Sequence, residues 1–287
     1  RLSCAESGNQ FNRCAGSRMN KTIPAGFTPG ISVFPNQRYL IEGACLESLR
    51  VKERFIDRFE IVLLDMGRTF MFDVDRFSDA DDFGATYRHV GGKILSDVGV
   101  SRIISALFER LLSYSRNPAY YDRFPSVLHC LQGLPEAKDL PEDELSLLQH
   151  VFALHEIGTV PDDYAKALCR LRESHRLAVL SDIWSKSDPY FDEFKRAGIR
   201  ELFEVIVFSS DYGHIKPSRY LFAKALEALK VDPSRIVFVG DSLRRDIAGA
   251  KAVGLSAIWI NAAGAEVNDG VAKPDLVIQD LRDLVDC

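Results

Sequence analysis

The sequence lacks the features that mark several classes of protein. It has no basic excess, since 36 Lys and Arg residues face 41 Asp and Glu residues for a net charge of −5. That balance argues against nucleic acid or an anionic membrane surface as a partner. No apolar run approaches the roughly 18 residues that span a bilayer, and the first residues lack the apolar core of a secretion signal. We therefore expect a cytoplasmic globular protein.

The sequence also lacks a recognisable pattern of cysteine or histidine ligands. The six cysteines are scattered and contain no Cys-x-x-Cys pair, which favours reduced thiols over disulfides or zinc. His150 and His155 are five residues apart and so miss the i,i+4 spacing of a helical zinc pair.

A short apolar run that ends in an acid is the most informative stretch present. Residues 61–64 (IVLL) lead directly into Asp65 and a turn, Gly67-Arg68-Thr69. Such a run predicts a strand buried on both faces, as in a parallel sheet. An acid at the carboxyl end of this strand lies where open α/β sheets bind ligands.

From residue 161 onward the sequence alternates between helical and strand patterns. Repeated β-α units predict a parallel sheet with right-handed crossovers. We expect Asp188 to cap one helix, Pro217 to open another that runs to about residue 230, and Gly254 to stop a third that begins near Ser242. Residues 277–284 predict a last strand or helix. Further strands are expected at 177–180, 203–208, 236–239 and 257–260, and a helix at 162–172.

The segment between the first strand and this region shows only helical spacing. We therefore predict an all-helical insertion over residues 77–158, cut by Pro118, Pro125, Pro135 and Pro141. The expected domains are a core formed by 59–76 and 159–287, this insertion, and an N-terminal extension of unknown role, 1–58. In and next to this extension, only residues 46–59 show the apolar spacing of a helix. The chain opens on Arg1, and Met19 is an alternative start.

Polar side chains follow several of the predicted strands. Asp65, Ser181, Lys216, Asp241 and Asp246 all come at or shortly after a strand end. Parallel strands share their carboxyl edge, so these groups should converge. Carboxylates suit Mg²⁺, and a lysine with a hydroxyl suits phosphoryl oxygens.

These motifs together resemble the haloacid dehalogenase (HAD) superfamily, in its C1-capped phosphatase branch. LLDMGRT resembles its motif I, LAVLSD motif II, HIKPSRYLF motif III and VFVGDSLRRDIAGAKAVG motif IV, in the family's order. The resemblance implies a Rossmann-like core, a helical cap after the first strand, Mg²⁺ dependence and a small phosphorylated substrate.

The resemblance also implies a role for each matching residue. Asp65 would be the nucleophile and a metal ligand. The Gly67 carbonyl, Asp241 and Asp246 would be the other protein ligands of the metal. Ser181 and Lys216 would act in catalysis and bind the phosphoryl group. Thr69 would brace the turn that leads to the cap and belong to the substrate-binding set.

One position departs from the family pattern. Phosphatases of the family usually read Asp-x-Asp, whose second Asp is the general acid and base, and here that position is Gly67. Glycine cannot transfer a proton, a contribution of typically 10²–10⁴ in rate. Asp73 and Asp75 are the nearest substitutes. Alternatively, the substrate needs little protonation of its leaving group, or phosphatase activity is lost.

Two rival functions stay open on this ground. A 2-haloacid dehalogenase also uses an Asp nucleophile without the second acid, although the retained motif around Asp241 speaks for Mg²⁺. A catalytically weak binding or regulatory protein would keep the pocket without turnover.

Several other side chains have an expected position. Arg244 and Arg245 are expected on the outer face of their helix. Candidates for contact with the substrate lie in the insertion: Tyr87, Arg88, Tyr120, Tyr121 and Arg123.

Overall fold

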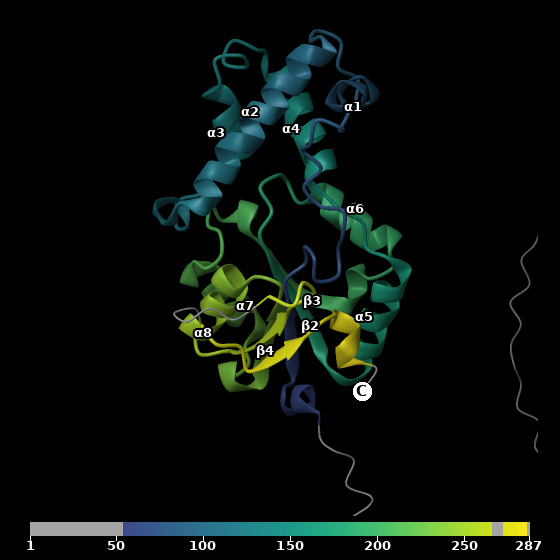
Figure 1. The fold of residues 1–287 in the computed structure, drawn as a ribbon, viewed down its shortest axis with the longest axis vertical. Coiled ribbons are helices and arrows are strands. Elements are labelled where there is room, and N and C mark those ends of the chain that lie inside the picture. Colours follow the sequence, from purple (N-terminus) through teal and green to yellow (C-terminus); the bar gives the residue numbers. More distant parts are fainter. Residues whose placement is uncertain (1–53, 266–271, 286–287) are drawn as a thin grey trace, which may run out of the picture. The chain divides into compact units, whose positions relative to one another are not determined.

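A computed structural model describes residues 54–265 and 272–285. Over these residues the chain forms a parallel sheet with helices on both faces and a helical insertion (Figure 1). None of the helices in this part of the chain has the length and apolar character needed to cross a membrane.

The sheet has six parallel strands in the order β3-β2-β1-β4-β5-β6. This is the doubly wound order of Rossmann-like folds, and it confirms the predicted fold class. The order reverses direction between β1 and β4, where such folds bind ligands. The strands are β1 (Ile61–Leu64), β2 (Arg176–Ser181), β3 (Phe203–Phe208), β4 (Ile236–Gly240), β5 (Ser256–Ile260) and β6 (Leu276–Ile278).

Helices cover the two faces of the sheet in pairs. α5 (Asp162–Ser174) and α6 (Asp188–Arg196) share one hydrophobic cluster with Val62 and Leu64 of β1. α7 (Arg219–Leu229) and α8 (Ala248–Ala252) share another with Ile61 and Leu63. All four β1 side chains are therefore fully buried, as the apolar run predicts.

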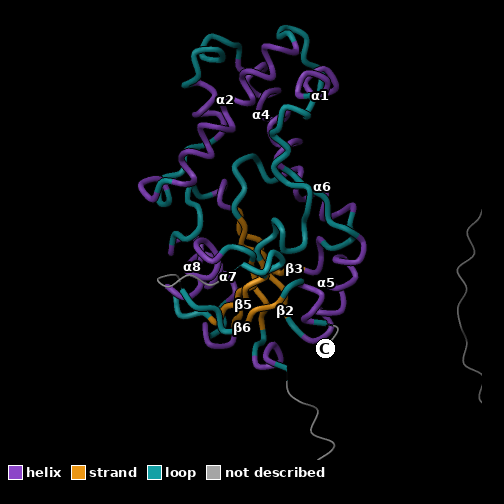
Figure 2. Tube along the Cα trace, viewed as in Figure 1, coloured by secondary structure: helices purple, strands orange, loops and turns teal. Residues whose placement is uncertain are grey.

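The insertion contains four helices and packs around its own core. These are α1 (Phe83–His89), α2 (Asp97–Arg116), α3 (Val127–Gln132) and α4 (Glu142–Glu156). Their apolar faces form a third hydrophobic cluster, which also takes in Trp184 from the loop after β2 and Ile215 from the loop after β3. The insertion lies beyond the carboxyl edge of the strands, as the two traces show (Figures 1 and 2).

The two chain segments that enter and leave the insertion pair with each other. Phe72 and Thr159 exchange backbone hydrogen bonds, with N–O distances of 2.9 and 2.8 Å. A side chain at Gly158 would lie 2.1 Å from the Phe72 carbonyl oxygen, so glycine permits this close pairing.

Several predicted helix boundaries were wrong by one or two residues. Asp188 is the first residue of α6 rather than its cap, since Ser187 precedes the helix and makes no side-chain cap bond. α7 begins at Arg219 because the Ser218 hydroxyl caps it, two residues after Pro217. The helix expected from Ser242 starts with a π-helical turn, Leu243–Ile247. Residues 276–284 form both a strand and a 3-10 turn.

The N-terminal prediction lies mostly outside the described residues. Of the helix expected over 46–59, only a 3-10 turn at Phe55–Arg58 is described. Cys130 and Cys169 are free thiols, and the other four cysteines lie outside the described residues.

Candidate active site

Carboxylates from two central strands meet where the strand order reverses. Asp65 follows β1 and Asp241 follows β4, and the Asp65 amide donates to the Val239 carbonyl at 2.8 Å. The parallel register of β1 and β4 thus sets the two acids at one edge of the sheet.

Asp65 is held through one of its two oxygens. Ser181 Oγ donates to Asp65 Oδ1 at 2.8 Å, and Lys216 Nζ donates to the same oxygen at 2.5 Å. Among the described residues no hydrogen bond reaches Oδ2. The side chain is 9% exposed, so its environment is well shielded from bulk water. Asp65 therefore has one fixed oxygen and one oxygen available to a ligand or an electrophile.

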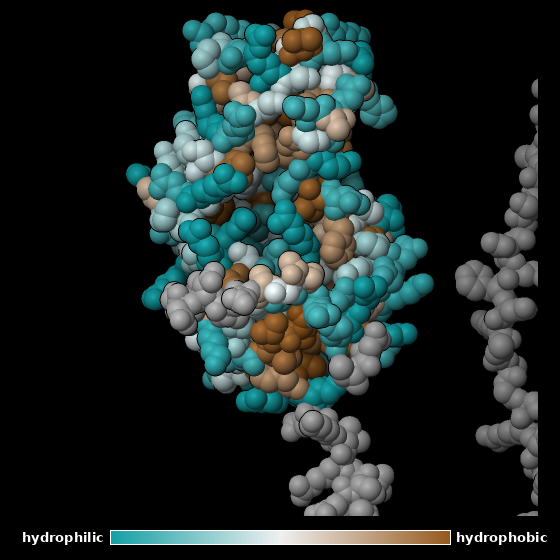
Figure 3. All heavy atoms as spheres, in the orientation of Figure 1, coloured by the Kyte–Doolittle hydropathy of each residue, from teal (hydrophilic) through white to brown (hydrophobic). Residues whose placement is uncertain are grey.

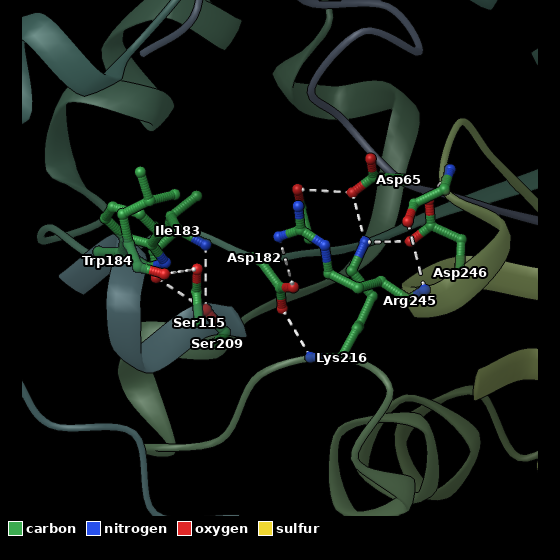
Figure 4. Close-up of polar contacts among 12 residues, drawn as sticks. Asp65, Ser115, Asp182, Ile183, Trp184, Ser209, Lys216, Arg245 and Asp246 are labelled. Carbon is green, nitrogen blue, oxygen red and sulfur yellow. Dashed lines mark hydrogen bonds and ion pairs between the residues drawn. The ribbon is translucent and has the colours of Figure 1, made fainter. Parts of the chain in front are cut away.

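Lys216 bridges two of the carboxylates (Figure 4). Its Nζ also pairs with Asp246 Oδ1 at 2.7 Å. Burial alone would lower the pKa of this lysine, but Asp246, Asp65 and Asp182 together raise it above its ordinary value. The ammonium therefore stays charged and offsets part of the negative charge of the site.

Asp246 is buried at the start of the helical segment after β4. Its Oδ2 accepts the Ser242 amide at 2.9 Å. A Cβ at Gly240 would lie 2.5 Å from this same oxygen, so a side chain there would displace Asp246. Burial raises the pKa of Asp246.

Asp241 completes a cluster of three acids. Ligand atoms of Asp65, Asp241 and Asp246 all lie within 4.8 Å of one another. Burial, together with the charges of Asp65 and Asp246, raises the pKa of Asp241 to about 7. Its carboxylate accepts no hydrogen bond from the described residues. Crowded like charges of this kind are relieved by a cation.

Sequence reasoning missed Asp182 and misplaced Arg245. Asp182 Oδ1 accepts the Lys216 amide at 2.9 Å and so fixes the loop that carries the lysine. Burial raises the pKa of Asp182 to about 6, although Lys216 and Arg245 oppose this. Arg245 was expected on the outer face of its helix. Its side chain is 45% exposed, but its Nη1 lies 3.8 Å from Asp182 Oδ2 and the residue lines the cavity. Helical periodicity shows which face of a helix is apolar and does not indicate which residues at its start line a cavity.

These groups line a cavity of about 230 Å³, which we call the acid cavity. Asp75 lines this cavity and Asp73 does not, so only one of the two candidate replacements for the missing acid lies at the site. Thr69 is buried and does not line it; its amide donates to the Met66 carbonyl in the turn after β1. The lining residues are Asp65, Gly67, Arg68, Val74, Asp75, Ser181, Asp182, Lys216, Asp241, Ser242, Arg245 and Asp246.

The charge of this lining fits a divalent cation. Five carboxylates face three cationic side chains, which leaves an excess of negative charge when all are ionised. The ligand atoms of Asp65, Asp241 and Asp246 are carboxylate oxygens, which are the hard ligands that Mg²⁺ takes. A cation of two positive charges would balance the site.

Comparison with known proteins gives a family match over most of the structured part. A family model described as haloacid dehalogenase-like hydrolase matches residues 69–254. The glyceraldehyde 3-phosphate phosphatase of Pyrococcus abyssi is 33% identical over 161 residues, which are 54% of this chain and 63% of that protein. The chain thus spans less than two thirds of the length of this and other curated relatives that it matches.

Solved structures share the fold at low identity. A HAD phosphatase from Thermococcus onnurineus matches with a TM-score of 0.52 at 25% identity, over 79% of this chain and 96% of that one. The L-2-haloacid dehalogenase of Xanthobacter autotrophicus, with chloropropionic acid covalently bound, matches with a TM-score of 0.53 at 22% identity, with the same coverage. The second likeness supports the fold alone.

Proposed function

The chain belongs to the haloacid dehalogenase-like hydrolases, and on this premise we propose that it is a Mg²⁺-dependent phosphatase of a small phosphorylated metabolite. The observation that carries the proposal is the state of Asp65, whose Oδ1 is held by Ser181 and Lys216 while Oδ2 accepts nothing from the described residues. A carboxylate fixed in this way is suited to attack phosphorus and form an aspartyl-phosphate, which water then hydrolyses.

Ser181 and Lys216 have two tasks in this proposal. They orient the nucleophile, and they are the nearest donors for the oxygens of a phosphoryl group next to Asp65. Because Lys216 is buried at 2% exposure, its charge acts in a medium that screens it weakly.

Asp65, Asp241, Asp246 and the Gly67 carbonyl would hold the Mg²⁺. A bound Mg²⁺ would supply positive charge that offsets the charge on the phosphoryl oxygens. The three acids within 4.8 Å of one another and the negative excess of the acid cavity support this assignment.

Asp75 is our candidate for the missing general acid. It lines the acid cavity, and burial raises its pKa, which favours a carboxyl that holds a proton. Both Asp73 and Asp75 are exposed on the surface, but only Asp75 lines the acid cavity. Asp75 follows Asp73 in a backbone segment where both have positive φ, 57° and 55°, an uncommon conformation that recurs at functional sites.

The helical insertion would act as a cap over the acid cavity. Its residues Tyr121, Asp122 and Phe124 hydrogen-bond to the loop that carries Lys216, through Ile215, Ser218 and Gly213. Closure over an aspartyl-phosphate would exclude water and select the substrate. The glyceraldehyde 3-phosphate phosphatase named above supports a small phosphorylated substrate.

Carbon–halogen cleavage is the second candidate, and Gly67 is the observation that favours it. That chemistry needs an Asp nucleophile and no second acid in the same motif. It needs no metal, whereas Asp65, Asp241 and Asp246 form a cluster that could hold Mg²⁺, so we rank it below phosphate hydrolysis.

One set of assays separates the phosphatase, the dehalogenase and the binding protein. Phosphate release is measured from p-nitrophenyl phosphate and from alkyl and sugar phosphates, with Mg²⁺ and with EDTA, and halide release from 2-chloropropionate in parallel. We expect Mg²⁺-dependent release from p-nitrophenyl phosphate, whose leaving group needs no acid. Halide release without phosphate release would establish the dehalogenase. Neither product, with Mg²⁺ still bound, would favour a binding protein.

A further inference from the structure

A second cavity adjoins the acid cavity on the side of the helical insertion. It has a volume of about 490 Å³ and shares Arg68, Asp75, Ser242 and Arg245 with the acid cavity. The two cavities are therefore neighbours, with these four residues at their boundary. We call the second one the arginine cavity, after the residues that distinguish it.

The charge of the arginine cavity is opposite to that of the acid cavity. Four arginines line it, Arg68, Arg116, Arg244 and Arg245, against a single carboxylate, Asp75. Within the described part of the chain, Arg68, Arg116 and Arg244 form no ion pair. Arginines that outnumber the acids at one cavity repel one another, and an anionic ligand relieves that repulsion.

The remaining walls of the arginine cavity are largely apolar or aromatic. Phe108 and Leu112 come from α2, Tyr121 from the segment that follows it, and Trp184 from the loop after β2. Figure 3 shows both hydrophilic and hydrophobic residues around the hollow between the insertion and the sheet. Apolar walls screen charge less than water does, so the arginines act more strongly on a ligand there.

We propose that the arginine cavity binds a second anionic group of the substrate, a carboxylate or another phosphate. The substrate is thus a phosphate monoester whose phosphoryl group lies in the acid cavity and whose second anion pairs with Arg116 and Arg244. This inference rests on the proposed phosphatase function. Guanidinium groups fit carboxylate and phosphate oxygens through paired hydrogen bonds.

The position of Asp75 agrees with this arrangement. It is one of the four residues at the boundary of the two cavities. In a substrate that spans both, the ester oxygen crosses this boundary, where a general acid would have to deliver its proton.

The test uses substrate pairs that differ in one group. 3-Phosphoglycerate and glycerol 3-phosphate differ by a carboxylate in place of a hydroxymethyl group, and fructose 1,6-bisphosphate and fructose 6-phosphate differ by one phosphate. We expect kcat/KM to be about tenfold or more higher for the member with two anionic groups in at least one pair, the size of a charge-assisted hydrogen bond. The favoured pair identifies which anion the cavity takes.

Arg116→Gln should reduce that preference about tenfold, mainly through KM. Arg102→Gln is the matched control, because Arg102 lies on the same helix, is exposed and does not line the cavity. It should leave the preference unchanged. Equal kcat/KM within both pairs, or a preference that survives Arg116→Gln, would overturn the inference while the phosphatase function stands.

A binding measurement keeps the inference testable if no ester is hydrolysed. Dissociation constants of both pairs are measured by calorimetry on Asp65→Asn protein with Mg²⁺, with and without Arg116→Gln. Tighter binding of the member with two anionic groups, dependent on Arg116, would support the arginine cavity even where turnover fails. Equal affinities would reject it.

Discussion

At the scale of single residues, Gly67 is the position on which the chemistry turns. Its Cβ direction is open, with no atom within 4 Å, and its φ lies outside the positive range. An L-residue therefore fits there without backbone strain. The site has room for the acid that related phosphatases carry, and the chain does without it.

Gly67→Asp should raise the hydrolysis of alkyl phosphates by up to about 10²-fold, at the lower end of the usual value of general acid catalysis. The effect on p-nitrophenyl phosphate should be smaller, because its leaving group needs no proton. Gly67→Asn, of the same size but unable to transfer a proton, is the control. Steady-state rates of all three proteins measure this. If Gly67→Asp leaves alkyl phosphate rates unchanged, Asp75 already serves as the acid.

At the scale of secondary-structure elements, the turn after β4 arranges the acids. It opens as a π-helical segment, Leu243–Ile247, a form that often occurs at functional sites. Two consecutive residues, Arg245 and Asp246, both line the acid cavity. The turn packs against Gly240 so closely that only glycine leaves room for the Asp246 carboxylate.

Gly240→Ala should therefore destabilise the protein by about 1–3 kcal/mol, the usual effect of overpacking, and also lower phosphatase activity. The added methyl would lie 2.5 Å from Asp246 Oδ2 and push it away from Lys216. Urea unfolding and p-nitrophenyl phosphate turnover measure the two effects. Gly67→Ala is the control for stability, since its methyl meets no atom. Unchanged stability in Gly240→Ala would contradict the packing argument.

A buried carboxyl group links α4 to the loop after β2. The buried Glu156 accepts the amides of Trp184 and Ser185 at 2.6 and 2.9 Å. Burial raises its pKa from 4.5 to about 7. The native state then binds more protons than the unfolded state between these two values, so stability falls as pH rises through that window.

We expect Glu156→Gln to remove this part of the pH dependence. The shift corresponds to about 3 kcal/mol, which is the upper limit of the effect. The measurement is the free energy of unfolding by urea at pH 5 and pH 8. The loss of stability between the two should be smaller in the variant than in the wild type. Equal losses in both proteins would show that Glu156 does not titrate in this range.

The elements themselves were largely predictable from local sequence. Apolar runs such as residues 61–64 and 203–208 gave strands at their observed bounds. Residues 61–64 form a continuous apolar run because β1 lies at the centre of the sheet and is buried on both faces, whereas β3 lies at its edge and is only partly buried. Residue types at strand ends also indicated that Asp65, Ser181, Lys216, Asp241 and Asp246 would converge. The π-helical turn carries no comparable signal, since its pattern is that of an ordinary helix.

The parts of the site that come from other elements were not predictable in the same way. Arg245 and Asp182 face each other only because β2 and the segment after β4 end at the same edge. The arginine cavity joins Arg116 at the end of α2 to Arg244 after β4, residues 128 positions apart in the sequence. No local pattern relates them, so only the packing of the insertion reveals the pairing.

At the scale of the whole molecule, charge of opposite sign is divided between adjoining cavities. The acid cavity concentrates carboxylates around the sheet edge, and the arginine cavity concentrates cations beneath the insertion. A ligand that satisfies both cavities has an anionic group next to the metal in the acid cavity and a second anionic group in the arginine cavity. This division fits a charged metabolite better than a neutral one.

Mg²⁺ should raise the melting temperature of the wild-type protein by several degrees at saturation, since binding to the native state alone is worth about 2.7 kcal/mol at 100 times Kd. Asp241→Asn should lose this increase. Without metal the variant should melt above the wild type, because it relieves repulsion from Asp65 and Asp246. Calorimetric melting with Mg²⁺ and with EDTA measures both. An equal response to Mg²⁺ in the two proteins would remove Asp241 from the metal site.

The most direct test of the account compares wild type with Asp65→Asn on p-nitrophenyl phosphate, each with Mg²⁺ and with EDTA. Asparagine has the same size and can still accept from Ser181 and Lys216, so the fold should persist, checked by circular dichroism. We expect the wild type to release phosphate only when Mg²⁺ is present, and Asp65→Asn to lose at least 10³-fold in rate, as for removal of a nucleophile. Phosphate release by Asp65→Asn at the wild-type rate would contradict the assignment of Asp65 and with it the proposed chemistry.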